Sequence, residues 1–599
     1  MLFSALRGGL GRICGLVLSV LVGLFPVSSA QAVNWVQGST NFNATASWVG
    51  GVLPSAATTA DFASSLTAAQ TPSLNSNISI LGLNMASNFG VTMGSAPGVQ
   101  TITLGTGGIQ KTGSGVLTIG TTGDRIGLAL VGDQSFSNDS ATAMTLHTNV
   151  SSTSAPVVLT LGGTNASGAI TVSGTFTDTA PTALSLVKSG LNTVTLSGAV
   201  TTSGGLTVSN GTLILAAAST LGGAVSVSGG TLSVGANTAF TGSMALSGGA
   251  LTLAGANTFS GTLTQSGGTL NLNNNGALGT GTWAVTGAST VAVNAARTLT
   301  NAVTLGGDLA YGSAVALTTS GGVTVSGVRT VDVSNATGSL VMSGVVSGAT
   351  GGMVKVGTGT LTLSGANTFA GGTTVNAGTV LVGSDTAFGT GGVTLTGGVV
   401  ASSNTTARTL SNAYTLNGAM TFGVAPTNTG ALTWSGAGTL GGATTLTVAN
   451  PVANVVTLSG VLGGSGALTK SGTGVLALSG ANTFTGGTTV NAGTVLVGHN
   501  AAVGTGGVTL AGGGGCEFGH DVANVVECVH VERCDDVWGS GDEHRGVDVE
   551  WCGDVGRSDR CDGGESCGEC GDVERGVGWE RGVDEVGERG VGVERGEYV

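Results

Sequence analysis

Residues 470–498 read KSGTGVLALSGANTFTGGTTVNAGTVLVG, and residues 355–383, 115 positions earlier, read KVGTGTLTLSGANTFAGGTTVNAGTVLVG. In both copies apolar and small polar residues alternate with a period of two, which is typical of β-strands. Outward from these copies, from about residue 65 to 512, glycine-containing pairs interrupt the same alternation every 8–12 residues and indicate turns. This part of the chain is therefore predicted to consist of short strands and tight corners, essentially without helix.

Weaker copies of the pattern begin at Lys111 and Lys188, and a copy without lysine includes residues 251–259. The only lysines of the chain, at 111, 188, 355 and 470, all occupy the same position of the motif. We interpret this position as structural and expect its side chain to lie in a solvated turn, because charged turn residues are usually exposed. The other motif positions that we single out in the two best copies are Gly357, Asn367, Phe369, Gly472, Asn482 and Phe484.

Short strands with a recurring unit favour an all-β solenoid, in which each coil buries its inward side chains against the next coil. Glycine at the corners permits positive φ and close approach of successive coils. With about 20–25 residues per coil, the repeat region would form ~20 coils, or a rod on the order of 100 Å long at ~4.8 Å per coil. The alternative is an array of antiparallel sandwiches or barrels, which the repeated unit favours less.

The Lys-x-Gly-x-Gly-x-Leu-x-Leu-Ser-Gly-Ala-Asn-Thr-Phe pattern and the Gly-Gly-Thr-Thr-Val-Asn-Ala-Gly-Thr-Val-Leu-Val run after it resemble the autotransporter-associated β-strand repeat, also called the passenger-associated transport repeat. The opening segment is similar to that of such passengers in Trp35, Trp48, Gly50, Gly51, Pro54, Asp61 and Phe62. The resemblance implies a right-handed parallel β-helix outside a Gram-negative cell, whose repeats assist passage and folding across the outer membrane. Many members of this family end in a β-barrel translocator and others end in different sorting signals, and this sequence shows neither.

The N-terminal 32 residues are predicted to be a secretory signal peptide. Arg7 and Arg12 precede a short apolar segment, and Ala30 and Ala32 provide a small-x-small cleavage site. A membrane anchor, the alternative, needs a longer apolar segment, and after removal of the signal we expect no transmembrane helix. The predicted organisation is a signal peptide at 1–32, an N-terminal capping segment at 33–64, a β-solenoid at 65–515 and a C-terminal tail at 516–599.

Charge and cysteine content change abruptly at residue 516. Residues 1–515 contain 10 Lys/Arg, 8 Asp and no Glu, for a formal charge of 10 − 8 = +2. Residues 516–599 contain 8 Arg, 23 Asp/Glu and seven of the eight cysteines, for a charge of 8 − 23 = −15. The body therefore has no basic footprint for nucleic acid. We expect the acidic, Val- and Gly-rich tail to be disordered.

The tail is related to the repeat through the genetic code. Residues 427–444 read TNTGALTWSGAGTLGGAT, and residues 542–559 read DEHRGVDVEWCGDVGRSD. If each codon of the first stretch is read one base early, the genetic code permits every residue of the second stretch. At the same offset of 115, about six of the 84 tail positions break this rule. We infer that the tail is a frameshifted copy of the repeat. The part encoded downstream in the original frame, including any translocator, is then expected to be missing.

Cys567 and Cys570 form a Cys-x-x-Cys pair, with five further cysteines and three histidines nearby, and such a pair is a common zinc half-site. Both cysteines, however, stand 115 positions after valines of the repeat, Val452 and Val455. A valine codon read one base early can encode cysteine, so the frameshift explains the spacing of the two cysteines. We therefore assign no metal, cofactor or redox role to the tail.

An enzymatic β-helix would need paired carboxylates or an acid–base pair on neighbouring coils. Before the tail, His147 and His499 are the only histidines, and neither has a recognisable Ser and Asp context. Two acid–base neighbours, Asp124 with Arg125 and Asp332 with Arg329, are interpreted as turn residues. The body carboxylates are scattered: Asp61, Asp124, Asp133, Asp139, Asp178, Asp308, Asp332 and Asp385.

The sequence thus predicts an exported, non-enzymatic, adhesin-like stalk of a Gram-negative cell surface, with no catalytic, cofactor or metal site. Its expected partners are an unidentified surface ligand, if any, and the outer-membrane translocation machinery. A secreted or periplasmic location is the alternative for a truncated chain. The alternative function is a carbohydrate-active β-helix enzyme, which two body aspartates within about 10 Å on one solvent-facing groove would favour.

Overall fold

The computed structural model describes residues 32–95, 98–153, 156–178, 181–424 and 426–511, and the backbone of 515–518. These residues form 56 short strands and two single-turn 3-10 helices, η1 (Thr45–Ser47) and η2 (Val49–Gly51), and the described part contains no α-helix. None of its helices is long and apolar enough to cross a bilayer. Ala30, at the predicted signal cleavage site, and the tail beyond 518 with its cysteine pair lie outside the described residues.

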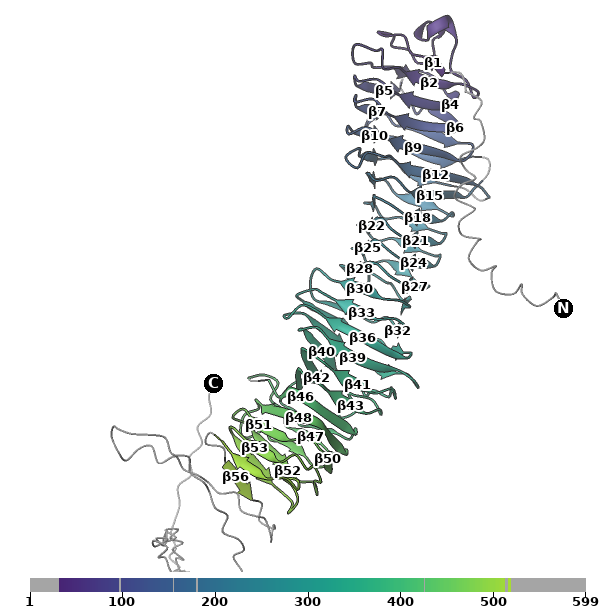
Figure 1. Cartoon of the computed structure of the whole chain (residues 1–599). Helices are drawn as coiled ribbons and strands as arrows, with labels where there is room; N and C mark the ends of the chain where they lie inside the picture. The colour runs from purple at the N-terminus through teal and green to yellow at the C-terminus, as the bar shows by residue number, and fades with distance from the viewer. Residues whose placement is uncertain are drawn as a thin grey trace, which may run out of the picture. The chain divides into compact units, whose positions relative to one another are not determined.

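Strands pair with the strand one coil further along the chain, and every pairing between the named strands of the described chain is parallel. Leu206 is paired with Val225, Val225 with Met244, and Met244 with Leu263, so that each coil here takes 19 residues. Figure 1 shows the labelled strands following one another in chain order. The strands of this ladder are β18 (Leu206–Val208), β21 (Val225–Val227), β24 (Met244–Leu246) and β27 (Thr262–Gln265).

The chain is therefore an all-β parallel solenoid of about 21 turns. The parallel pairing excludes the array of antiparallel sandwiches or barrels. A coil such as 206–221 contains three strands, so the solenoid has three sides here. Coils elsewhere are longer: Leu117 is paired with Met144, 27 residues later. The three strands of the coil at 206–221 are β18, β19 (Thr212–Leu215) and β20 (Thr220–Leu221).

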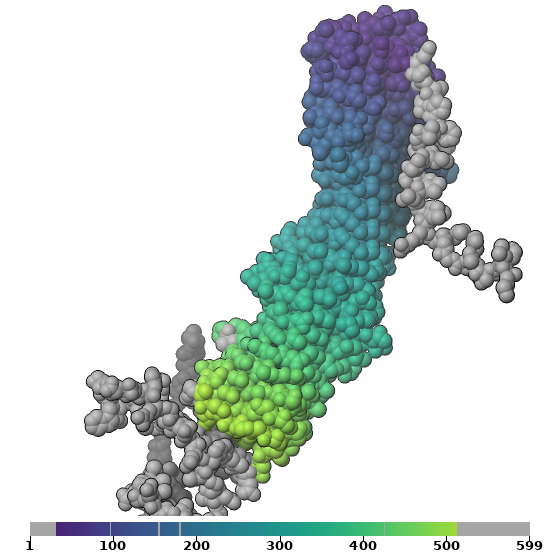
Figure 2. Space-filling view, viewed as in Figure 1, coloured from purple at the N-terminus to yellow at the C-terminus, as the bar shows by residue number. Residues whose placement is uncertain are grey.

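The core is a set of apolar columns that run through the stacked coils. On one side Leu213, Leu232, Leu251 and Leu270 stand in register, each at most 1% exposed. Their strand neighbours point outward because side chains alternate along a strand. Full burial of each leucine contributes roughly 1.5–3 kcal/mol. The apolar–polar alternation in the sequence is thus the alternation between buried and outward-facing positions. Figure 2 shows the outer surface of the stacked coils.

Aromatic side chains close the core at the N-terminal end of the described chain. Trp35 and Phe42 each lie 5.0 Å from Trp48, measured between ring centroids, in edge-to-face contacts. Trp48 also donates a hydrogen bond from Nε1 to the carbonyl oxygen of Phe42, at 2.9 Å. The strands of this segment, β1 (Ala32–Asn34) and β2 (Thr59–Phe62), belong to the same ladder as β4 (Ile78–Met85). The segment predicted as a cap therefore contributes strands to the solenoid.

The pairing register changes where the sequence leaves the repeat. In the earlier copy of the repeat Thr379 is paired with Val399, so an offset of 115 would pair Thr494 with residue 514. Instead Thr494 is paired with Gly515, one residue later. The strands are β54 (Thr494–Val497) and β56 (Gly515–Phe518). The register of the last described strand is therefore shifted by one residue relative to the repeat.

Candidate functional site: the corners of the repeat motif

The four motif lysines are buried, each with an exposed fraction of 0%. The prediction that they lie in solvated turns is therefore wrong. Each is on an inward-facing position of a strand, at or next to its end. The four strands are β6 (Thr101–Lys111), β15 (Leu184–Lys188), β39 (Gly352–Val356) and β51 (Leu468–Ser471).

The strand alternation explains why lysine points inward. Lys355 is paired with Val331 on the preceding coil and with Val375 on the following coil, and both valines are fully buried. The aliphatic part of the lysine therefore continues an apolar column, as long charged side chains often do. Because the strand ends at the corner, the ammonium group reaches the backbone oxygens there. At this position the inward register outweighs the preference of a charge for water.

Each ammonium group binds the corner of its own coil in the same way. In all four cases Nζ donates a hydrogen bond to the carbonyl oxygen of the glycine two residues later, which explains the Lys-x-Gly pattern. The distance is 2.9 Å for Lys111 and Gly113, 2.8 Å for Lys355 and Gly357, and 2.8 Å for Lys470 and Gly472. The fourth pair is Lys188 and Gly190.

Each ammonium group also reaches the next coil. Lys188, Lys355 and Lys470 donate to the carbonyl oxygen of the residue 22 positions later, at 3.2, 3.3 and 3.0 Å. Lys111 instead donates to the hydroxyl groups of Ser140 and Thr142. The lysines therefore join consecutive coils at the corner through hydrogen bonds to oxygens that carry no charge. The carbonyl partners on the next coil are Asn210, Ala377 and Ala492.

Glycine on the next coil leaves room for the ammonium group. Gly378 and Gly493 have φ of 70° and 71°, in the left-handed region that favours glycine. A Cβ atom on these residues would lie only 2.7 and 2.8 Å from Nζ of Lys355 and Lys470. Lys355 and Lys470 are each followed, about one coil later, by the sequence Asn-Ala-Gly, and the glycine of this sequence is thus part of the same site.

Burial changes the acidity of the lysines. It lowers the pKa of each of the four ammonium groups to about 8, because the charged form has lost its water. The carboxylate of Asp332 raises the pKa of Lys355, but the loss of water is the larger effect. These lysines are therefore buried cations held by neutral acceptors.

The motif asparagine connects three consecutive coils. Oδ1 of Asn367 accepts the backbone N–H of Val346 on the preceding coil at 2.7 Å, and Nδ2 donates to the carbonyl oxygen of Ala387 on the following coil at 2.6 Å. Asn482 makes the same pair of bonds to Leu462 and Ala502. Both asparagines are at most 2% exposed. A buried polar side chain with both groups satisfied is favourable, and it specifies the distance between coils.

The motif phenylalanines fill the corner two residues further on. Phe369 and Phe484 are fully buried. A Cβ atom on Gly389 would lie 3.0 Å from Cγ of Phe369, and one on Gly504 would lie 2.8 Å from Cδ2 of Phe484. Each ring is therefore packed against the glycine of the next coil. The Asn-Thr-Phe part of the motif, like Lys-x-Gly, acts between coils.

A second corner motif was missed in the sequence analysis. Residues 296–305, ARTLTNAVTL, and 407–416, ARTLSNAYTL, are 111 positions apart, which is the signal that could have revealed it. Asn301 donates from Nδ2 to the carbonyl oxygen of Gly281 at 2.7 Å, and Asn412 donates to that of Gly391 at 2.7 Å. These asparagines also connect consecutive coils.

Gln265 was missed as well and takes the place of a lysine. It follows Lys188 in one column, four coils later, and is fully buried. Its Nε2 donates to the carbonyl oxygens of Gly268 and Thr290 at 3.1 and 2.9 Å. Trp283 donates to its Oε1 at 3.0 Å. A neutral amide thus forms the contacts that the ammonium group forms elsewhere.

Two body aspartates lie near one another on the outer surface. Leu309 is paired with Val331, so Asp308 and Asp332 face outward on neighbouring coils, two residues out of register. Strand geometry puts their Cα atoms about 8 Å apart. The backbone N–H of Thr330 donates to Oδ1 of Asp308 at 2.8 Å, which is a structural contact. Oδ1 of Asp332 is buried without a hydrogen-bond partner among the described residues.

His147 has a serine partner that the sequence did not reveal. Its Nδ1 lies 2.8 Å from Oγ of Ser173 on the next coil. Arg125 donates from a guanidinium nitrogen to the carbonyl oxygen of the same serine at 2.9 Å, and the N–H of Asp124 donates to Oγ1 of Thr121. A catalytic Ser–His pair also requires a group that orients the histidine, and no contact among the described residues supplies one. The pair connects coils, as the corner asparagines do.

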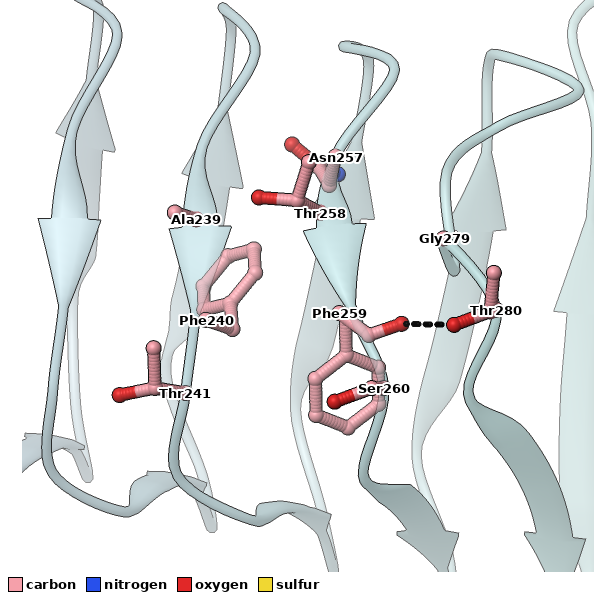
Figure 3. Close-up of a pocket in the computed structure, with 9 residues that line it drawn as sticks. All are labelled: Ala239, Phe240, Thr241, Asn257, Thr258, Phe259, Ser260, Gly279 and Thr280. Carbon is pink, nitrogen blue, oxygen red and sulfur yellow. Dashed lines mark hydrogen bonds between the residues drawn. The ribbon is translucent and has the colours of Figure 1, made fainter.

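The described residues contain no group of three His, Cys, Asp or Glu side chains arranged to hold a metal ion. A cavity of about 430 Å³ lies along β23 (Ala239–Phe240) and β26 (Thr258–Phe259) (Figure 3). Phe240 and Phe259 lie in it with ring centroids 6.3 Å apart, and Thr280 donates to the carbonyl oxygen of Phe259. Its lining includes hydroxyl groups but no charged residue: Ala239, Phe240, Thr241, Asn257, Thr258, Phe259, Ser260, Gly279 and Thr280.

Comparison with known protein families identifies one repeated unit in this chain. The model of the passenger-associated-transport-repeat matches residues 186–215, 210–234, 245–272, 353–382 and 468–497. Three of these matches contain the buried lysines at 188, 355 and 470, and a fourth contains the copy without lysine, in which Asn257 forms the same cross-coil contacts as Asn367. No curated protein and no solved structure matches the chain.

Proposed function

From the five passenger-associated transport repeats that the chain carries, we propose that it is the passenger part of an autotransporter, an exported, non-enzymatic stalk whose repeats hold successive coils together. The repeat family and the β-solenoid fit such a passenger. The observation that carries the proposal is that the motif residues act between coils rather than at an external ligand. Asn367 bonds to the coil before it and the coil after it, and Lys355 bonds to its own corner and the next one.

This arrangement suits a chain that crosses the outer membrane before it folds. Each new coil can form its hydrogen bonds on the coil already stacked, because the partners lie about 20 residues apart. The body contains no cysteine between residues 33 and 515, so its folding does not depend on disulfide formation. The proposed location is the Gram-negative cell surface, reached through the predicted signal peptide at 1–32.

Surface display tests this proposal. Residues 1–511 would be joined to a β-barrel translocator and produced in a Gram-negative host, with deletion of residues 1–32 as the control. We expect external protease to reach the solenoid on intact cells only when the signal segment is present. Retention of the intact fusion inside the cell, despite signal and translocator, would contradict the proposal.

We further propose that the reading frame is displaced between residues 511 and 516. The codon relation between the tail and the repeat, which keeps one offset of 115 throughout, supports this. The nucleotide sequence around these codons tests it. Restoring the frame should extend the repeat beyond residue 599, whereas a sequence that yields no further repeat in either neighbouring frame would contradict it.

A carbohydrate-active enzyme is the second candidate, favoured by the position of Asp308 and Asp332 on neighbouring coils of the outer surface, with Cα atoms about 8 Å apart. Carboxylates of retaining and inverting glycosidases lie about 5–10 Å apart. We expect no release of reducing sugar from a panel of polysaccharides. Release that disappears in the Asp308→Asn, Asp332→Asn double variant, but persists in Asp385→Asn, would establish this function instead.

A further inference from the structure

We propose that the four corner lysines couple the stacking of the coils to the release of protons, so that the solenoid is more stable at mildly alkaline than at neutral pH. This inference does not depend on the proposed export. It follows from where the ammonium groups lie and from what surrounds them.

The first observation is complete burial without a counter-ion. All four lysine side chains have an exposed fraction of 0%. Their hydrogen-bond acceptors are carbonyl and hydroxyl oxygens, and no carboxylate is among them. Burying a charge is costly unless it is paired, and a group in this position commonly becomes neutral instead. A neutral amine can still donate two hydrogen bonds to these oxygens, which is all that Lys188 donates and one fewer than Lys111, Lys355 and Lys470 donate.

The second observation is the apolar character of the columns around the lysines. Leu161 and Val208 are paired with Lys188, Val331 and Val375 with Lys355, and Leu446 and Val490 with Lys470. Met85 and Asn138 are paired with Lys111. None of these neighbours titrates.

Two aspartates lie near the lysines. Asp139 is adjacent to the column of Lys111, but its carboxylate accepts hydrogen bonds from Thr164 on the next coil. Asp332 acts on Lys355 and only partly opposes the effect of burial. Burial therefore has a larger effect on the pKa of Lys111 and Lys355 than either carboxylate has.

The direction of the pH effect follows from the pKa values. Folding lowers the pKa of each lysine from its usual 10.5 to about 8. Between these values the unfolded chain holds protons that the folded chain has released, so stability rises with pH. Relative to neutral pH, the free energy of unfolding has gained its full increment above pH 10.5. As the pH falls from 10.5 to 8 this increment is lost, and below about pH 8 none of it remains. Within this window each coupled lysine raises the folding equilibrium constant up to about tenfold per pH unit.

The lysines can be observed directly, because the chain has only four. In the full chain labelled with ¹³Cε-lysine, we expect all four signals to titrate near pH 8 in the folded state and near 10.5 in urea. Midpoints near 10.5 in the folded protein would overturn the proposal. This measurement needs no variant and so does not depend on any substituted chain being able to fold.

Stability measurements provide the second test. The denaturant midpoint of the wild-type chain should be higher at pH 9.5 than at pH 7. Lys470→Met should remove about a quarter of this rise. The matched control is Leu446→Met, which places methionine in the same column one coil earlier and should keep the whole rise.

The pH range stops at 9.5 because burial raises the pKa of Tyr311 and Tyr414, which opposes the lysine effect at higher pH. A reductant keeps the cysteines reduced in all samples. A midpoint that does not change between pH 7 and 9.5, or an equal rise in Lys470→Met and wild type, would overturn the proposal.

Discussion

Asn482 and Lys470 show that single side chains of the repeat form bonds between coils. Both are buried polar residues in an otherwise apolar interior, and both are hydrogen-bonded to backbone groups of more than one coil. A buried polar group is acceptable in a core only when its partners are present. The residues that make the family motif recognisable are therefore those whose loss would leave backbone groups of two coils unpaired.

Replacement of Asn482 by alanine is expected to destabilise the solenoid. It leaves the N–H of Leu462 and the carbonyl oxygen of Ala502 buried and unpaired, at about 1–3 kcal/mol for each group. Chemical denaturation measures the loss. Asn491→Ala is the matched control, because Asn491 is exposed, and it should change stability by less than about 0.5 kcal/mol. Equal effects of the two substitutions would refute the cross-coil role.

The lysines are expected to be inaccessible to amine reagents. Because all four are fully buried, a short exposure of the native protein to an N-hydroxysuccinimide ester should modify the N-terminal amine and leave lysine unmodified. After denaturation in urea all four lysines should react. Peptide mass spectrometry reads out both states, and rapid labelling of Lys355 or Lys470 in the native protein would show that these side chains are exposed.

The corners, rather than the strands, limit which sequences the coils tolerate. Inward strand positions accept Leu, Val, Met or Trp, as the column of Leu206, Val225, Met244, Leu263 and Trp283 shows. The corners that receive the ammonium groups of Lys355 and Lys470 require a residue without Cβ and with positive φ. Gly493 meets both requirements.

Gly493→Ala is therefore expected to cost about 1–3 kcal/mol for its left-handed backbone, and more from contact with carbonyl oxygens of the preceding coil. Thermal denaturation measures the change. Gly507→Ala is the control, since a Cβ atom there meets nothing within 4 Å. The double variant Gly493→Ala, Lys470→Ala should lose less stability than the sum of the losses in the two single variants, because Lys470→Ala removes one of the groups that clash with the new Cβ atom. Strict additivity would argue against contact between the two residues.

The described part of the chain is a stack in which coils contact mainly their neighbours, so whole coils should be removable. The two best copies are 115 residues apart, and residue 383 occupies the position of residue 498. Deletion of residues 384–498 joins equivalent positions and removes an integral number of coils. Stability of such an array depends on neighbouring interfaces, which the deletion recreates.

We expect this deletion to keep the β-sheet circular dichroism spectrum and a cooperative thermal transition. Deletion of only residues 384–393, about half a coil, is the control and should abolish cooperative melting, because the columns fall out of register. If both deletions melt alike, the register between coils does not hold the structure together.

Much of the fold could be read from local pattern. Alternation predicts strands and glycine pairs predict corners, because both depend on residues close together in the chain. The 115-residue unit predicts stacking, because a repeat is visible in the sequence itself. The roles of Lys355, Gln265 and His147 depended on the folded chain. Their partners are 18–26 residues away, and closure of each coil brings them together. A charge in a glycine-rich stretch therefore suggested a solvated turn, whereas the inward register and the carbonyl oxygens of the next coil place that charge in the core.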